Sequence, residues 1–251
     1  MRPESIHILS DKRQTSIAAA MHGAQQLRDT LATKQEACIV LATGVSQFDL
    51  LNALLQEKDI DWHRVIGFHL DEYAGLPITH PASFSKYLWE RFVSKLPTPM
   101  NAFHFIQTTG GIESEISRLN RLIGHYEIDV AFIGIGENGH LAFNDPPADF
   151  NVAAPYIYVE LDAACRQQQL GEGWFDSIDD VPTHAISMSI QHIMKCKQII
   201  CTVPGRRKAE AVQHALTGPV TPTVPASILQ THPRCDLYLD KDSASRLDSG
   251  L

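Results

Sequence analysis

Short apolar runs that alternate with longer amphipathic segments constrain the fold of this chain most strongly. The run Ala37–Ala42 contains apolar residues only. A strand with one solvated face alternates apolar and polar residues, whereas a strand of a parallel sheet covered on both faces does not. The predicted strands are Ser5–Leu9, Ala37–Ala42, Val65–Leu70, Asp129–Ile135, Tyr156–Leu161, Gln198–Val203 and Cys235–Leu239.

Helical segments separate these strands. Asp11 is predicted to cap a long helix with Ile17, Ala20, Met21 and Leu27 on its apolar face. Further helices are predicted at Phe48–Leu55, Ser83–Lys95, Ile112–Tyr126 and Arg206–Leu216. Repeated strand–helix units predict an α/β fold: a three-layer, doubly wound, mostly parallel, Rossmann-like sheet with helices on both faces. No low-complexity linker or internal repeat interrupts the pattern, so we expect a single domain over residues 1–251.

Charge and composition exclude several classes of partner. The formal net charge of −8 disfavours binding to nucleic acid or to an anionic membrane surface. No apolar run approaches the roughly 20 residues of a membrane span, and the N-terminus lacks the apolar core of a signal peptide. We therefore expect a cytoplasmic protein. Its five cysteines form no CxxC pair and are interpreted as buried, reduced thiols: Cys38, Cys165, Cys196, Cys201 and Cys235.

Ligands of open α/β sheets bind beyond the carboxyl ends of the strands. The first such segment, Thr43–Ser46, opens a helix and offers backbone N–H groups and hydroxyls to a phosphate, although a plain helix cap would look the same. It matches neither the P-loop nor GxGxxG, so nucleotide binding is weakly supported. A second segment places Arg206, Arg207 and Lys208 in the first turn of a helix, where the macrodipole disfavours cations. A bound anion would explain them; a solvated basic turn is the alternative.

Two further segments carry groups that can transfer protons. Asp71 and Glu72 follow a predicted strand, where one acid could serve as a general base and where ordinary surface acids are the alternative. The glycine-rich loop Gly134–Asp145 holds His140, which suits proton transfer near neutral pH. A purely structural histidine is the alternative. No second histidine or cysteine stands at ligand spacing nearby, so no metal site is expected.

Taken in order, these segments resemble the glucosamine-6-phosphate deaminase (isomerase) family. The resemblance covers nearly the whole chain and is strongest over Phe68–Pro77 and Gly134–Pro146. It implies aldose–ketose isomerisation of an amino-sugar phosphate with loss of ammonia, giving fructose 6-phosphate without a metal or organic cofactor. The implied partner is a phosphorylated amino sugar, and a homo-oligomer is left open.

The resemblance also implies roles for individual residues. Asp71 would move a proton between C2 and C1 of the sugar, and His140 would open the pyranose ring. Asn138 and Asp145 stand where the family usually has Asp and Glu supporting the histidine, so Asn138 would remove a negative charge beside His140. The implied phosphate-binding residues are Thr43, Gly44, Ser46 and Lys208, with Arg207 as an addition.

One part of the family pattern is difficult to match. A phosphate-binding arginine of the family lies in the segment that corresponds to Ala148–Gly173, where Arg166 is the candidate. The basic residues of the family's allosteric site have no evident counterpart, so regulation by an amino-sugar phosphate is not expected.

Two other readings stay open at the level of sequence. The first is a sister enzyme, either a galactosamine-6-phosphate deaminase or a hydrolase similar to 6-phosphogluconolactonase. The second is a non-catalytic phosphosugar sensor, against which both Asp71 and His140 are present.

Overall fold

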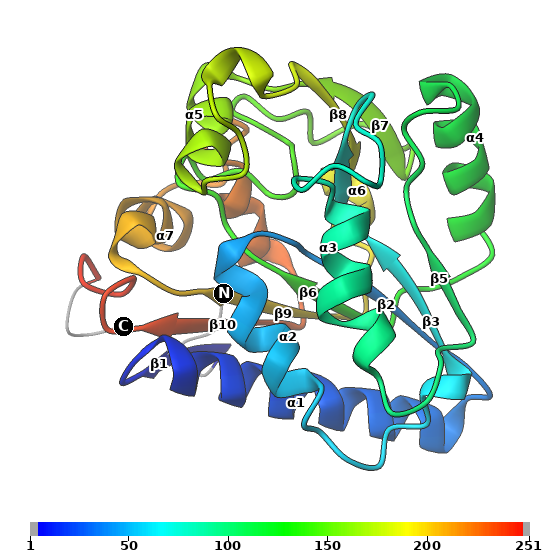
Figure 1. The fold of residues 1–251 in the computed structure, drawn as a ribbon. Helices are drawn as coiled ribbons and strands as arrows, with labels where there is room; N and C mark the ends of the chain where they lie inside the picture. Colours follow the sequence, from blue (N-terminus) through cyan, green and yellow to red (C-terminus); the bar gives the residue numbers. More distant parts are fainter. Residues whose placement is uncertain (1–4, 248–251) are drawn as a thin grey trace.

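A parallel sheet forms the centre of the molecule. The computed structural model describes residues 5–247, and its larger sheet has seven strands in the order β1-β10-β9-β6-β2-β3-β5 (Figure 1). All neighbouring strands in it run parallel. The strands are β1 (Ile6–Leu9), β2 (Ala37–Leu41), β3 (Val65–His69), β5 (Ala102–His104), β6 (Val130–Ile133), β9 (Gln198–Val203) and β10 (Cys235–Asp240). The predicted fold class is confirmed, although the sequence did not indicate the short strand β5.

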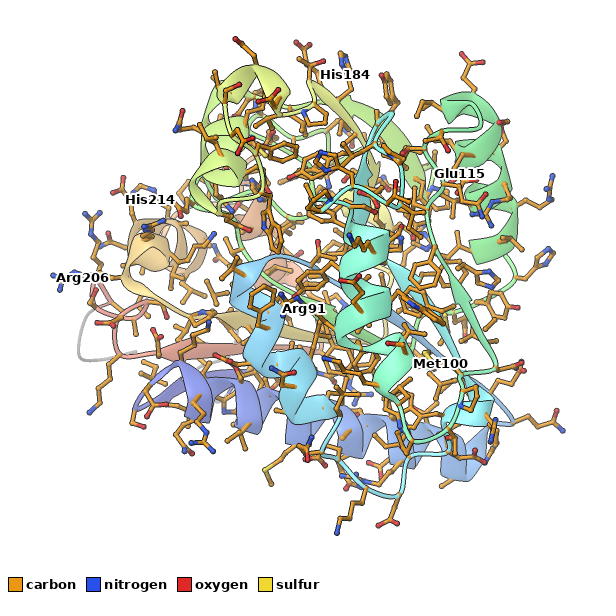
Figure 2. All side chains as sticks on the ribbon, viewed as in Figure 1. Arg91, Met100, Glu115, His184, Arg206 and His214 are labelled. Carbon is orange, nitrogen blue, oxygen red and sulfur yellow. The ribbon has the colours of Figure 1, made fainter. Side chains whose placement is uncertain are left out.

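Helices cover both faces of this sheet, with side chains filling the space between the layers (Figure 2). One face packs against α1 (Lys12–Thr33), α2 (Phe48–Leu54) and α3 (Phe84–Arg91), and the other against α4 (Ile112–Ile123), α6 (Ile190–Ile193) and α7 (Ala209–Thr217). Within β2, Ile39 and Leu41 belong to the first core, whereas Cys38 and Val40 belong to the second. Burial on both faces therefore explains why this run contains no polar residue.

A smaller antiparallel sheet stands beside the carboxyl ends of the main strands. It consists of β4 (Asp71–Tyr73), β8 (His184–Met188) and β7 (Tyr156–Glu160), in that order. The chain leaves the main sheet at Leu70, as predicted, but Asp71–Tyr73 then forms a separate strand that the sequence did not indicate. β8 and the covering helix α5 (Ala163–Gly171) were not predicted.

The long helix α1 packs closely against the main sheet because most side chains on its buried face are small. Asp11 caps it as predicted, accepting the N–H of Gln14 at 2.9 Å. Ala20 and Leu27 are buried, but Met21 is 55 % exposed, so its predicted place on the apolar face is wrong. The helix axis approaches β6 at Gly23, where an added Cβ would lie 2.1 Å from the Phe132 ring. Larger side chains on this face would hold the helix farther from the sheet.

Two expectations drawn from composition are also tested by the structure. All five cysteines are buried and unpaired in the described part of the chain. Among residues 5–247, no helix combines the length and apolarity needed to cross a membrane.

We predict that Gly23→Ala destabilises the protein although alanine is the better helix former. Helix propensity favours alanine by about 1 kcal/mol, but overpacking against Phe132 costs about 1–3 kcal/mol. We therefore expect the free energy of unfolding in urea to fall. Gly171→Ala is the matched control, because a Cβ there meets no atom within 4 Å and should leave stability equal or higher. Equal gains in both variants would contradict this account of the α1–β6 contact.

Candidate active site

A pocket opens where the strand order of the main sheet reverses. From β2 the chain continues through β3 to β5 on one side, whereas β6 pairs with β2 on the other side. Such a switch point leaves a crevice at the carboxyl ends of the strands. The pocket there spans about 520 Å³, part of which is open to solvent. The sequence-predicted residues that line it are Thr43, Gly44, Ser46, Asp71, His140 and Lys208.

Asp71 presents a buried carboxyl group to this pocket. Its residue is 6 % exposed, and its Oδ1 atom has no hydrogen-bond partner among the described residues. Burial raises the pKa of Asp71 well above its usual value, and the negative charge of Glu72 raises it further, while the Thr43 hydroxyl opposes the shift. A carboxyl group with a raised pKa holds its proton more tightly than an ordinary aspartate, as is typical of acids that transfer protons in active sites.

The neighbouring acid has a structural role instead. The Glu72 carboxylate accepts hydrogen bonds from the Ser83 hydroxyl at 2.9 Å and from the N–H groups of Phe84 at 3.0 Å and Ser85 at 2.9 Å. These donors lie at the N-terminus of α3, where a negative charge is favoured. Burial raises the pKa of Glu72, and these hydrogen bonds oppose the shift. Glu72 thus fastens β4 to α3, which leaves Asp71 on the pocket side.

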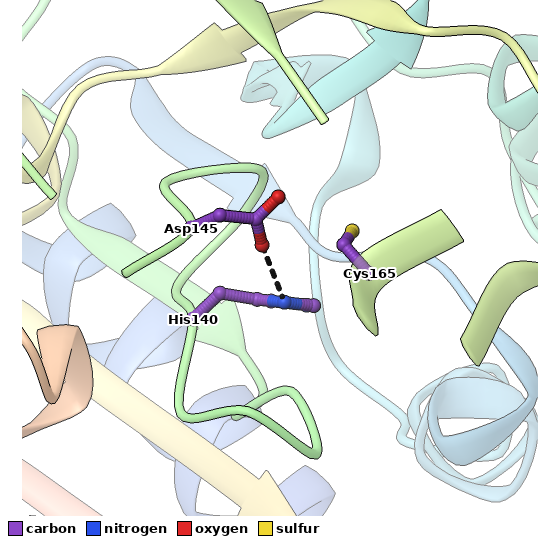
Figure 3. A group of neighbouring side chains, drawn as sticks. All are labelled: His140, Asp145 and Cys165. Carbon is purple, nitrogen blue, oxygen red and sulfur yellow. Dashed lines mark ion pairs between the residues drawn. The ribbon is translucent and has the colours of Figure 1, made fainter. Parts of the chain in front are cut away.

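The His140 ring fits only because residue 136 has no side chain. A Cβ on Gly136 would lie 2.3 Å from Nε2 of the ring. The backbone N–H of His140 donates to Oδ1 of Asn138 at 3.1 Å, which fixes the turn that carries the ring. Its Nδ1 atom lies 3.1 Å from Oδ1 of Asp145 (Figure 3), a contact that is an ion pair when the imidazole is protonated. The ring N–H is poorly aligned with the carboxylate, so Nδ1 has no hydrogen-bond partner among the described residues.

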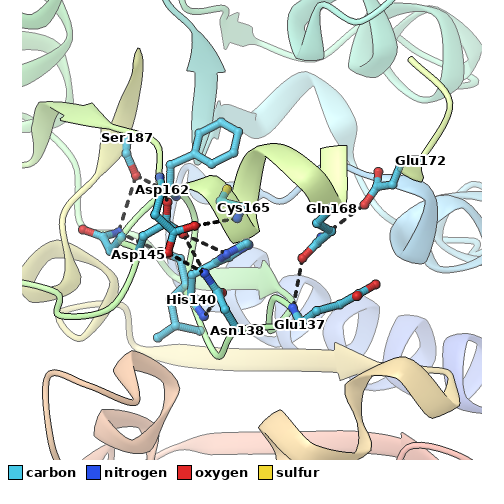
Figure 4. Close-up of polar contacts among 12 residues, drawn as sticks. Glu137, Asn138, His140, Asp145, Asp162, Cys165, Gln168, Glu172 and Ser187 are labelled. Atoms are coloured by element: carbon cyan, nitrogen blue, oxygen red, sulfur yellow. Dashed lines mark hydrogen bonds and ion pairs between the residues drawn. The ribbon is translucent and has the colours of Figure 1, made fainter. Parts of the chain in front are cut away.

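Asp145 is the centre of the polar cluster around this histidine (Figure 4). Its carboxylate accepts from Nδ2 of Asn138 at 3.1 Å and from the backbone N–H of Asp162 at 3.0 Å. Burial raises the pKa of Asp145, but the contacts with His140, Asp162 and Asn138 outweigh burial and hold that pKa below its usual value. Asp145 is therefore a carboxylate at neutral pH, positioned to stabilise positive charge on the imidazole.

The third member of this cluster, Cys165, was missed by the sequence analysis. Ligand-type atoms of His140, Asp145 and Cys165 lie within 4.8 Å of one another, close enough together to hold a metal ion (Figure 3). No metal site was expected because no second histidine or cysteine stands near His140 along the chain, but Cys165 reaches the cluster from α5. Burial raises the pKa of the Cys165 thiol, so it is a neutral thiol here and a metal would have to displace its proton.

Asn138 lies between two carboxylates. Its Nδ2 atom donates to Oδ1 of Asp145 at 3.1 Å and to Oδ2 of Asp162 at 3.4 Å. Asp162 also caps α5 by accepting the N–H of Cys165 at 2.5 Å. An amide at position 138 supplies donors to both acids, whereas a carboxylate there would face two like charges.

The other end of the pocket has the features of an anion site. Gly44, with φ of 95°, leads into the turn Val45–Gln47 and then into α2. Lys208 is 9 % exposed and ends the turn Arg206–Lys208 ahead of α7. Burial lowers the pKa of Lys208, while the negative charges of Glu137 and Glu172 raise it. Lys208 has no ion-pair partner within 4.0 Å in the described part of the chain.

Two predicted cations lie elsewhere. Arg207 is exposed and lines a separate hollow with Glu210 and Arg246; its neighbour Arg206 also projects from the edge of the molecule (Figure 2). Arg166 donates to the carbonyl groups of Ile178 at 2.5 Å and Val181 at 2.9 Å, so it braces the segment after α5 and does not line the pocket.

The helix α5 contributes pocket residues that the sequence did not indicate, namely Gln168, Gln169 and Glu172 at its end. The N-cap Asp162 was a local signal for this helix. Nothing local shows that its far end reaches the Thr43–Ser46 turn.

We predict that Asn138→Asp lowers stability, and more so at high pH. Crowded carboxylates have a raised pKa in the folded state, so the folded variant binds more protons than the unfolded chain and loses stability as pH rises. We expect a loss of about 2 kcal/mol or more at pH 8 and a smaller loss at pH 5, measured by urea unfolding. The double variant Asn138→Asp/Asp162→Asn should recover most of it, because an amide donor returns.

Asp162→Asn alone is the control for this experiment. Asparagine also caps helices well, so the change should cost little. An Asn138→Asp variant as stable as the parent protein at both pH values would show that the amide does not separate the two acids.

Comparisons with known proteins agree with this architecture. The family described as glucosamine-6-phosphate isomerases/6-phosphogluconolactonase matches residues 10–237. A glucosamine-6-phosphate deaminase of Oenococcus oeni is 38 % identical over 210 residues, which are 82 % of this chain and 85 % of the relative. Another from Bacillus thuringiensis is 34 % identical over 246 residues, 96 % of this chain and 88 % of the relative.

Solved structures of related proteins have the same fold. A monomeric glucosamine-6-phosphate deaminase has a TM-score of 0.88 at 29 % identity and covers 96 % of this chain and 98 % of its own. The 6-phosphogluconolactonase from Trypanosoma brucei shares the fold alone, with a TM-score of 0.79 at 15 % identity over 97 % of this chain and 98 % of its own. The chain belongs to the glucosamine-6-phosphate isomerase/6-phosphogluconolactonase family.

Proposed function

We propose that this protein is a glucosamine-6-phosphate deaminase, which converts glucosamine 6-phosphate and water to fructose 6-phosphate and ammonia. The relatives of that name cover most of the chain. The observation that carries the proposal is the pairing of two proton-transfer groups, Asp71 and His140, in one pocket that also holds a buried lysine.

His140 opens the sugar ring in this proposal. A proton is delivered to the ring oxygen while the anomeric hydroxyl loses one, which leaves an open-chain aldehyde. A histidine can give and take protons near pH 7. The ionised Asp145, 3.1 Å from Nδ1 of His140, stabilises the positive charge that the imidazole carries during this step.

Asp71 then carries the isomerisation. It removes the proton from C2, next to the carbonyl carbon, and a proton returns at C1, while the carbonyl oxygen gains a proton and the amino group loses one. The resulting imine at C2 is hydrolysed by water, so that ammonia leaves and a ketone remains. The raised pKa of Asp71 supports this role, because a more basic carboxylate takes a proton from carbon more readily than an ordinary aspartate does.

Lys208 and the Thr43–Ser46 turn hold the phosphate in this proposal. Backbone N–H groups at a helix start and a buried ammonium group are a common anion site. Anchoring the phosphate orients the reacting carbons at the opposite end of the pocket. Arg207 is not part of the proposed site because it is exposed outside the pocket. The buried free thiols support a reducing, cytoplasmic location for the reaction.

Asp71→Asn should abolish most of the turnover while the protein still folds and binds the phosphosugar. We expect kcat to fall by roughly two orders of magnitude or more, the size of a general-base effect. In the parent protein, the acid limb of kcat/KM should lie above the usual range of an aspartate, because burial raises the pKa of Asp71. Release of ammonia and formation of fructose 6-phosphate are the readouts. Turnover within a few-fold of the parent value would remove Asp71 from the mechanism.

A substrate panel separates this function from the alternatives, which are a galactosamine-6-phosphate deaminase, a hydrolase similar to 6-phosphogluconolactonase and a phosphosugar sensor. Galactosamine 6-phosphate and 6-phosphogluconolactone are assayed beside glucosamine 6-phosphate, with ammonia and phosphogluconate measured. A faster reaction of either alternative would reassign the substrate. Tight phosphosugar binding without turnover of any of the three compounds would favour a non-catalytic sensor.

Lys208→Ala should raise KM for the phosphosugar by roughly tenfold to a hundredfold, because a hydrogen bond to a charged group contributes about 1.5–3 kcal/mol. Arg207→Ala is the matched control from the same turn and should change KM less than about twofold. Unphosphorylated glucosamine should be a very poor substrate. If glucosamine reacts as well as its 6-phosphate, the proposed phosphate site is wrong.

A further inference from the structure

We infer that Glu172 determines how strongly this pocket binds phosphate, because its carboxylate lies at the anion-binding turn and competes with the ligand for it. This inference rests on the proposed function for the identity of the anion. Glu172 follows the last residue of α5, Gly171, and lines the same pocket as Thr43, Ser46 and Lys208.

The contact with the turn is direct. Oε2 of Glu172 accepts the backbone N–H of Val45 at 3.4 Å, a long hydrogen bond. Its two carboxylate oxygens lie 3.6 and 3.9 Å from the position that a Cβ on Gly44 would take. A carboxylate thus lies against the Val45 N–H, one of the backbone groups that a phosphate at this turn would use.

Gln168 holds the carboxylate in that place. Its Nε2 atom donates to Oε1 of Glu172 at 3.2 Å, and its Oε1 atom accepts the N–H of Glu137 at 3.0 Å (Figure 4). One glutamine therefore links Glu172 to the loop that carries His140. The position of Glu172 is set by the folded site and is not that of a free surface side chain.

The charges at this end of the pocket are unfavourable for a dianion. Among the described residues, Lys208 is the one lysine or arginine that lines the pocket. The negative charges of Glu137 and Glu172 act on it, opposed by the positive charge of Arg207, which is exposed outside the pocket. A phosphate that reaches the Val45 N–H must displace the Glu172 carboxylate or bear its repulsion. The repulsion from Glu172 offsets part of the attraction that the turn and Lys208 supply. Glu172 therefore weakens phosphate binding, although it does not contact the reacting carbons.

Glu172→Gln tests this inference, because it keeps the shape and one acceptor oxygen while removing the charge. Inorganic phosphate is the probe, titrated by calorimetry or by NMR. We expect its Kd to fall by about tenfold, the effect of removing one like charge beside a partly exposed anion. KM for glucosamine 6-phosphate should fall in parallel, with kcat changed little. Glu172→Ala should show the same direction.

Asp179→Asn is the matched control. It removes one acidic charge from the exposed turn Ile178–Asp180, beyond α5 and outside the pocket lining, so its Kd for phosphate should stay within about twofold of the parent value.

The outcomes separate this inference from the proposed function. If the parent protein does not deaminate glucosamine 6-phosphate but Glu172→Gln still binds phosphate more tightly, the proposed function fails and the inference holds. Unchanged or weaker phosphate binding in Glu172→Gln overturns the inference; weaker binding would show that Glu172 helps to hold the ligand. Absence of phosphate binding in both proteins overturns it as well, because the turn would then not be a phosphate site.

Discussion

The buried carboxylate of Asp145 is the interaction on which the rest of the site depends. It accepts hydrogen bonds from Asn138 and from the backbone of Asp162, and it lies beside the His140 ring. Through these contacts one side chain joins the loop after β6 to the start of α5. A buried carboxylate without these partners would be costly, and with them its charge is favoured. The orientation of the histidine and the placement of α5 are thus determined together.

The acidic residues near the pocket have different tasks because their surroundings differ. Glu72 is saturated by donors at the start of α3, so it serves as an anchor. Asp71, one residue earlier, is buried with an unpaired oxygen, so its charge is costly and its proton is exchangeable. Because Asp71 and Glu72 are consecutive residues of the strand β4, their side chains point to opposite faces of it.

Charge is also balanced across the site in a way that differs from the expected family pattern. The resemblance led us to expect an aspartate where this chain has Asn138, and the structure places Asp162 within 3.4 Å of that amide. At the other end, the segment expected to supply an arginine brings Glu172 to the turn instead, while Arg166 braces backbone carbonyls. Both differences alter local charge while leaving the sheet and the proton-transfer groups in place.

The sequence was sufficient to predict the parallel sheet, because strands buried on both faces must be apolar throughout, as Ala37–Ala42 is. It also indicated most of the pocket, since the rule that ligands bind beyond strand carboxyl ends selected Thr43, Asp71, His140 and Lys208. The short strands β4 and β8 were not predicted, because strands that pair across more than a hundred residues leave no local sequence pattern. Tertiary structure alone decided that Cys165 and Glu172 reach the site, that Arg207 does not, and that Glu72 is an anchor. Each of these depends on where a side chain points after distant segments have packed, and that direction is set by contacts that no single segment of sequence contains.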